Sequence, residues 1–325
     1  MTLPAHADVL SAAARIAPHA HVTPVLRSRA LDAIAGCELH FKCEPLQRAG
    51  SFKFRGACNA VWSLPDAIAA RGVVTHSSGN HGAALALAAH TRGIACHVVV
   101  PEGAVAAKLA AIQGYGATLH PCAPTIAARE ATAERVRRDT GASFVHPYTD
   151  PAVIAGQGTV ALELLKAAPG LDALVAPVGG GGLASGCALV LAQLAPACAL
   201  LLGEPAGAAD TSRSLAAGHR DIDFVPDTIC DGLRGTLGQP GFDILHRHGA
   251  RVAVVEDEQT LAAMQLLWTR LKLLVEPSSA IAFAAVLQQR DRLAGKRVGV
   301  VLSGGNVDLS ALAQWFPSAS GKSPA

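Results

Sequence analysis

The chain has 325 residues, of which 50% are hydrophobic and 16% are charged, and its formal net charge is +2. A chain of this length and composition can bury a sizeable core, and it is too apolar for an intrinsically disordered protein. Its basic residues form only short clusters, such as the one at 135–138. A nucleic-acid partner is therefore not expected.

The sequence also argues against export and against a membrane span. The N-terminal ten residues lack the basic start and apolar core of a signal peptide. Residues 183–203 carry no charge, but Gln193 and Pro196 interrupt them, which predicts a helix, a turn and a buried strand. The eight cysteines are scattered without a Cys-x-x-Cys motif, as is typical of buried thiols in a reducing compartment. We expect a cytoplasmic protein.

Apolar strands alternate with helices along the chain. Strands are predicted at residues 72–75, 97–100, 173–176, 200–202 and 298–302. Ala- and Leu-rich segments predict helices at residues 83–90, 127–138, 158–167 and 261–274. This pattern indicates an α/β protein whose parallel sheet is covered by helices on both faces. Ligands of such sheets bind at the carboxyl ends of the strands.

The first chemically informative segment, residues 50–57, contains a lysine between two phenylalanines. Apolar neighbours make the ammonium of Lys53 easier to deprotonate, as a Schiff-base nucleophile requires. Ser51, just upstream, is predicted to cap a helix.

A second informative segment, residues 179–182, is a run of four glycines between a predicted strand and a helix. Glycines allow close approach of an anion, and the free N–H groups of the helix start would face it, so a phosphate is the expected guest. Gly179, Gly181 and Ala184 also fit a relaxed dinucleotide fingerprint, with Glu204 where a ribose-binding acid would stand. A nicotinamide-dependent oxidoreductase is therefore an alternative.

The ordered motifs resemble those of fold-type II pyridoxal-phosphate (PLP) enzymes, in the serine racemase and threonine/serine dehydratase branch. The similar segments are SFKFRGA (51–57), SSGNHG (77–82), AGQGT (155–159), GGGG (179–182) and LSGGN (302–306). The resemblance implies two open twisted α/β domains with the cofactor in the cleft between them. Residues 1–71 and 150–325 would form the large PLP-binding domain, and residues 72–149 the small substrate-clamping domain.

The resemblance assigns cofactor contacts to Phe52, Lys53, Asn80, Gly179, Gly180, Gly181, Gly182 and Ser303. Lys53 would hold the cofactor as a Schiff base and then act as the base that removes the α-proton. The four glycines would hold the phosphate, Asn80 would bond the ring hydroxyl, and Phe52 would pack nearby. Ser303 would face the pyridine nitrogen. A neutral hydroxyl does not keep that nitrogen protonated, which favours loss of a β-hydroxyl over transamination.

The resemblance also places Ser77, Asn80 and His81 in the loop that clamps the substrate carboxylate. Ser78 is the candidate acid on the face opposite the lysine, and its hydroxyl makes racemisation chemically possible. Arg129 aligns with an arginine that approaches the distal polar group of the substrate. A guanidinium can donate two hydrogen bonds to a β-carboxylate in a bidentate manner, although an exposed helix arginine is the alternative interpretation.

Three further residues match the divalent-metal pattern of the racemase branch: the carboxylates of Glu204 and Asp210 and the carbonyl of Ala208. Such hard oxygen ligands suit Mg²⁺ or Ca²⁺, with Mn²⁺ as a third candidate. The alternative is a pair of solvated loop carboxylates.

The expected activity is that of a serine/threonine dehydratase, which converts a β-hydroxy amino acid to a 2-oxo acid and ammonia. Tyr148, where dehydratases tend to have an aromatic residue, favours elimination, whereas Arg29 and Ala49 depart from the nucleotide pocket of mammalian racemases. A dedicated racemase, a 3-hydroxyaspartate dehydratase and a catalytically silent cofactor-binding protein remain alternatives. The resemblance also implies a homodimer.

Overall fold

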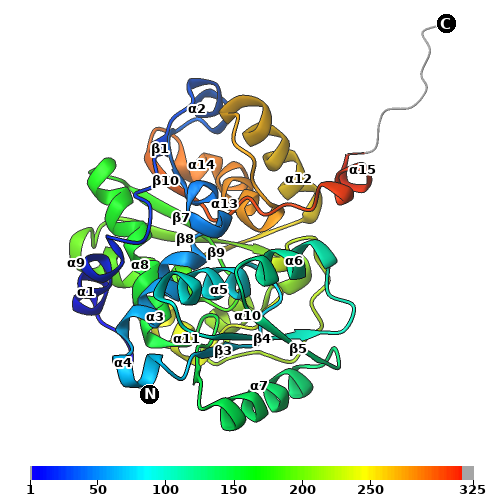
Figure 1. Ribbon diagram of the computed structural model, residues 1–325. Helices are drawn as coiled ribbons and strands as arrows, with labels where there is room; N and C mark the ends of the chain where they lie inside the picture. The colour runs from blue at the N-terminus through cyan, green and yellow to red at the C-terminus, as the bar shows by residue number, and fades with distance from the viewer. Residues whose placement is uncertain (1, 317–325) are drawn as a thin grey trace, which may run out of the picture.

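The computed structural model describes residues 2–316. Strands from the N-terminal and C-terminal parts of the chain pair in one six-stranded sheet (Figure 1). Its order is β1-β2-β10-β7-β8-β9, and only the β1–β2 pair is antiparallel. The strands are β1 (Val25–Leu26), β2 (Glu38–Cys43), β7 (Ala173–Pro177), β8 (Ala199–Pro205), β9 (Arg251–Val255) and β10 (Arg297–Leu302). Residues from the two ends of the chain thereby share one framework.

The middle of the chain forms a second sheet of four parallel strands, in the order β5-β4-β3-β6. These strands are β3 (Val73–Thr75), β4 (Cys96–Pro101), β5 (Thr118–Cys122) and β6 (Ser143–Phe144). Helices α5 (Asn80–Arg92) and α6 (Ala106–Gly114) lie on one side of this sheet and α7 (Ile126–Thr140) on the other (Figure 1).

Helices cover both faces of the larger sheet, and each face has its own apolar core (Figure 1). One core includes α2 (Arg29–Ala35), α12 (Asp257–Leu266), α13 (Pro277–Gln288) and α14 (Arg290–Leu293). The other includes α1 (His6–Ile16), α8 (Pro151–Ala167), α9 (Gly182–Leu194) and α11 (Gln239–His248). Further helices are α3 (Lys53–Ser63), α4 (Asp66–Ala69), α10 (Asp210–Ala217) and α15 (Leu312–Trp315).

Strand β10 shows why both faces are apolar. Val300 lies in register with Phe41 of β2 and Val175 of β7, and all three side chains enter the first core. The next residue, Val301, enters the second core, because successive side chains of a strand point to opposite faces. The predicted α/β class with helices on both faces is confirmed.

All five predicted strands are present, and three of the four predicted helices differ from the structure mainly in length. The helix predicted at 158–167 begins at Pro151, where the Asp150 side chain caps it. The helix predicted at 261–274 is wrong at its end. A π-helical turn, Leu267–Leu271, follows α12, and Lys272 then adopts a positive φ of 59°, which ends the helix.

Residues 183–203 form most of α9, a turn and β8, as predicted. Among the described residues, no helix has both the length and the apolar character needed to cross a membrane.

Candidate active site

Lys53 is the first residue of α3, and contacts with the segment after β10 set its position. Ser51 forms an antiparallel bridge with Gly304, and the N–H of Phe52 donates to the carbonyl of Ser303 (2.9 Å). The predicted cap at Ser51 is wrong. Its backbone is extended to make the bridge, the N-cap residue is Phe52, and the buried Ser51 hydroxyl has no partner among the described residues.

The amine of Lys53 lies in a largely apolar setting. Its Nζ donates to the carbonyl of Pro147 (3.0 Å) and lies 5.1 Å from the centre of the Phe52 ring. Burial lowers the pKa of Lys53 to about 8, although the carboxylate of Glu276 acts in the opposite direction. A substantial fraction of this amine is therefore neutral near physiological pH, as a nucleophile or a base requires.

The four-glycine segment, residues 179–182, joins the end of β7 to the start of α9. Gly181 has φ +90°, which a residue with a side chain rarely adopts. A Cβ at Gly179 would lie 2.8 Å from the Leu233 backbone, and one at Gly180 would lie 2.3 Å from the Tyr148 ring. Three of the four glycines are therefore required by local geometry.

This segment fits an anionic group. The N–H groups at the start of α9 have no partner within the helix, and the helix dipole favours negative charge there. Ser185, in the first turn of α9, has a buried hydroxyl without a hydrogen-bond partner among the described residues. The chemistry of these donors suits the phosphate of PLP.

One short turn links the lysine to the glycines. The carbonyl of Pro147 accepts from Lys53, and the ring of the next residue, Tyr148, packs against Gly180. Nδ1 of His146 accepts the N–H of Tyr148 (3.3 Å), so the turn is held from within. The Lys53 amine and the four-glycine segment therefore contact the same short turn.

The segment after β3 enters the N-terminus of α5. A Cβ at Gly82 would lie 2.0 Å from the Ser77 carbonyl, so the loop folds tightly over the helix start. His81 is buried, and burial together with the charge of Lys53 holds its pKa well below 6.5. Ser77, Ser78 and Asn80 are only partly buried. Neutral polar groups and a helix N-terminus are suited to bind a carboxylate.

Glu276 is a buried carboxylate that the sequence analysis missed. Its Oε1 accepts from Nδ2 of Asn80 (2.7 Å), and its Oε2 accepts from the N–H of Asn306 (3.1 Å). Nδ2 of Asn306 also donates to Oδ1 of Asn80 (2.9 Å). Burial raises the pKa of Glu276 to about 7. A single acidic residue between the apolar run 273–275 and Pro277 was the available signal.

Ser303, at the end of β10, is buried, and its hydroxyl donates to the carbonyl of Ser278 (3.4 Å). Its backbone carbonyl accepts the N–H of Phe52, so Ser303 lies next to the start of α3.

Arg129, the predicted contact for the distal group of the substrate, lies in α7 and is partly buried. Its Nε is buried and has no hydrogen-bond partner among the described residues. Burial lowers the pKa of His76, and the charge of Arg129 acts in the same direction. The ring of His76 lies 5.4 Å from that of His146, which immediately precedes the carbonyl that accepts from Lys53. Burial and the charge of Arg129 thus both favour the neutral form of His76.

The carboxylates of Glu204 and Asp210 are both fully buried. Glu204 accepts the N–H groups of Thr211 (2.7 Å) and Ser212 (2.8 Å), and Asp210 accepts the N–H of Leu237 (2.7 Å). Burial raises the pKa of Glu204 to about 7 and that of Asp210 to about 6. Oδ1 of Asp210 has no partner among the described residues, and a cation would supply one. The burial of both carboxylates excludes the alternative of solvated loop carboxylates.

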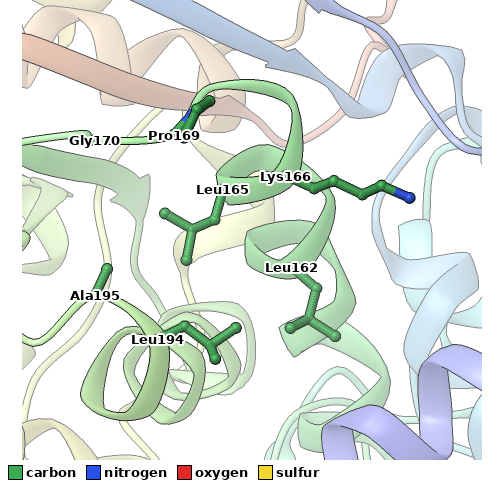
Figure 2. Close-up of a pocket in the computed structure, with 7 residues that line it drawn as sticks. All are labelled: Leu162, Leu165, Lys166, Pro169, Gly170, Leu194 and Ala195. Atoms are coloured by element: carbon green, nitrogen blue, oxygen red, sulfur yellow. The ribbon is translucent and has the colours of Figure 1, made fainter.

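Of two cavities, the first adjoins this constellation through Asn80 and Asn306, and the second lies apart from it. One, of about 340 Å³, is lined by Ala49, Asn80, Tyr115, Asn306 and neighbouring residues. The other, of about 330 Å³, lies between the C-terminal ends of α8 and α9 (Figure 2). Its residues 169–170 and 195 precede strands β7 and β8 and so belong to the amino-terminal edge of the sheet, whereas the glycines follow β7 at the carboxyl edge.

The fold and these donors define a PLP-binding enzyme. Residues 16–304 match the model of the pyridoxal-phosphate dependent enzyme family, and the chain belongs to this family. The family predicted from the ordered motifs is thereby confirmed. The four-glycine segment accordingly belongs to a PLP enzyme and not to a nicotinamide-dependent oxidoreductase.

Within the family, the chain is similar to enzymes of hydroxy amino acids. It is 46% identical to the beta-hydroxyaspartate dehydratase of Paracoccus denitrificans, over 96% of this chain and 99% of that protein. It is also 46% identical to the serine racemase of Dictyostelium discoideum, over 94% and 96% of the two chains. The maize serine racemase structure superposes with a TM-score of 0.94 at 42% identity and covers 96% of this chain and 97% of its own.

Proposed function

We propose that this protein is a PLP-dependent dehydratase that converts a β-hydroxy amino acid to a 2-oxo acid and ammonia. The observation that supports this most strongly is the partly buried amine of Lys53 at the turn that also contacts the four-glycine segment. The relatives comprise a dehydratase and racemases, and both reactions begin at the α-carbon of an amino acid.

In this proposal the chain holds PLP through Lys53, residues 179–182 and the neighbours Phe52, Asn80 and Ser303. When bound, PLP supplies an electron sink for the α-carbon of the substrate. The protein's own groups move the protons. The N-terminus of α5, with Ser77, Asn80 and His81, orients the substrate carboxylate.

Lys53 takes the α-proton at Nζ, which its lowered pKa of about 8 permits. The β-hydroxyl then departs as water with the proton that Lys53 has taken, and the released enamine takes up water to give a 2-oxo acid and ammonia. Ser78, on the opposite face, can return a proton to the α-carbon and so supply a racemase activity. We further propose that residues 72–149 act as a small domain that closes over the substrate and excludes water.

A 2-oxo-acid assay over a panel of β-hydroxy amino acids, with chiral analysis of the remaining substrate, tests this function. We expect a yellow protein that releases 2-oxo acid. Inversion of the substrate without such release would identify a dedicated racemase, and a yellow protein that does neither would overturn the proposal.

A 3-hydroxyaspartate substrate is a second candidate, because Nε of Arg129 is buried and no residue between 2 and 316 supplies it with a partner. A β-carboxylate would supply one, and the Paracoccus relative is a beta-hydroxyaspartate dehydratase.

We expect Arg129→Ala to lower kcat/KM for 3-hydroxyaspartate by about 10- to 100-fold, the worth of charge-assisted hydrogen bonds, and to change serine turnover little. Arg129→Lys should restore part of the loss. Arg135→Ala, an exposed change on the same helix, is the matched control. An unchanged ratio between the two substrates would remove Arg129 from specificity.

We also propose that Glu204, Asp210 and the carbonyl of Ala208 bind a divalent cation, Mg²⁺ or Ca²⁺. Two buried carboxylates support this site, and within the described part of the chain one of their oxygens has no hydrogen-bond partner. Because the site lies at the end of β8 and the start of α10, we assign it a structural role.

After chelation, added Mg²⁺ or Ca²⁺ should raise the thermal midpoint of unfolding. The stabilisation is about 2.7 kcal/mol when the ion is at 100 times its Kd. Asp210→Asn should abolish this response. Asp221→Asn, which removes the carboxylate that pairs with Arg213, should retain it. An equal response in both variants would contradict the site.

We propose a cytoplasmic homodimer, on the resemblance to the racemase and dehydratase branch. Light scattering of the purified protein should give twice the chain mass, and a monomer would contradict the dimer.

A further inference from the structure

A cluster of buried charges lies behind the helix that begins with Lys53. Lys42, Glu44 and Arg55 are fully buried, and Glu163 is 22% exposed. We infer that Arg55 is a positioning residue that fixes the first turn of α3, and hence the amine of Lys53, relative to the rest of the site. This inference rests on the proposed role of Lys53.

Arg55 binds two carboxylates with one guanidinium. Its Nε and Nη2 donate to Glu44 (2.7 and 2.9 Å), and its Nη1 and Nη2 donate to Glu163 (2.6 and 2.8 Å). Glu44 follows β2 and Glu163 belongs to α8, so the planar fork joins α3 to two different elements. Nη1 also donates to the hydroxyl of Thr159 (3.3 Å).

The next residue adds a contact without a side chain. A Cβ at Gly56 would lie 2.7 Å from the carbonyl of Val153, and one at Gly156 would lie 2.6 Å from the Cα of Gly56, so α3 and α8 touch through their backbones. The N–H of Gly56 donates to Oε1 of Gln157 (3.1 Å). This arrangement gives residues 155–159 a physical role, which is to dock α8 against the turn that contains Lys53.

The charges in the cluster balance, with Lys42 and Arg55 against Glu44 and Glu163. Lys42 donates to Glu163 and to the carbonyl of Thr23 (2.6 Å), and no hydrogen bond of its side chain reaches α3. The two cations therefore share one environment, but only Arg55 belongs to the helix of Lys53. This difference provides a matched control.

The test compares cofactor-loaded Arg55→Lys with Lys42→Gln. A lysine at position 55 keeps the charge but cannot bind both carboxylates with a rigid fork. We expect kcat to fall by about 100-fold, the effect of a displacement of about 1 Å in the site, with KM nearly unchanged. The pH at which the visible absorbance of the bound cofactor changes should shift as well. Lys42→Gln should lower the thermal midpoint and leave kcat and the absorbance titration close to wild type.

Glu163→Gln is the second variant, for the case in which Arg55→Lys does not fold. Its position is partly exposed, and it weakens one half of the fork, so we expect a smaller fall in kcat and a smaller spectral shift. If folded Arg55→Lys, or folded Glu163→Gln in its place, keeps the wild-type kcat and absorbance titration, the positioning role is overturned. The absorbance titration needs no turnover, so this failure is distinguishable from an inactive wild type, which would overturn the proposed function.

Discussion

Lys53→Ala is expected to abolish 2-oxo-acid release and to yield a protein without the visible colour of bound PLP. The variant removes both the covalent attachment point and the base at the α-carbon. Deletion of a reacting side chain typically costs roughly 10⁴- to 10⁶-fold in kcat. The Lys53 amine bonds to a backbone carbonyl and makes no ion pair among the described residues. Its removal therefore breaks no salt bridge.

The matched control is Lys166→Ala, an exposed lysine at the end of α8. It should remain yellow and active, with an unchanged thermal midpoint. The absorbance spectrum measures cofactor binding in the two variants, and the 2-oxo-acid assay measures their turnover. Robust turnover by Lys53→Ala would refute the role of this residue, whatever its colour.

Gly180→Ala is expected to have the second-largest effect, on cofactor affinity. The new Cβ would lie 2.3–2.5 Å from three atoms of the Tyr148 ring, so either the glycine segment or the turn at 147–148 must move. Overpacking of this kind costs about 1–3 kcal/mol. If the displacement falls on the phosphate loop, PLP binding weakens by about 10- to 100-fold. Titration of the apoprotein with PLP measures the change.

A second substitution sharpens this prediction. All three nearest atoms belong to the Tyr148 side chain, so Tyr148→Ala should restore part of the affinity lost in Gly180→Ala. It should not rescue Gly179→Ala, whose Cβ would meet the Leu233 backbone. Gly114→Ala, with open space around its Cβ, is the neutral control. Full affinity in Gly180→Ala would show that this segment does not hold the phosphate.

The architecture could be predicted because strong local patterns determine it. The runs at 298–302 and 173–176 are apolar on both faces, as is typical of strands in a parallel sheet covered on both sides. The end of the helix after residue 266 could not be predicted, because it depends on the left-handed conformation of Lys272, for which the sequence has no glycine signal. Ser51 has the side chain of a cap, but its pairing with Gly304 takes precedence, and that contact is remote in sequence.

The candidate site could be predicted only in part, for the same reason. Lys53 and the glycines are local motifs, so the sequence is sufficient to select them. Glu276 and Arg55 depend on partners far along the chain, namely Asn80 and Glu163. A single charged residue in an apolar context indicates burial but does not identify its partner.

Borohydride reduction of the purified yellow protein, followed by peptide mass analysis, tests the central claim most directly. Reduction makes the bond between the cofactor and its lysine permanent, so the modified residue can be identified without any assay of turnover. We predict one phosphopyridoxyl adduct, located on the peptide that contains Lys53 and absent from the Lys53→Ala protein. An adduct on another lysine, or a yellow protein with no adduct at position 53, would contradict the assignment.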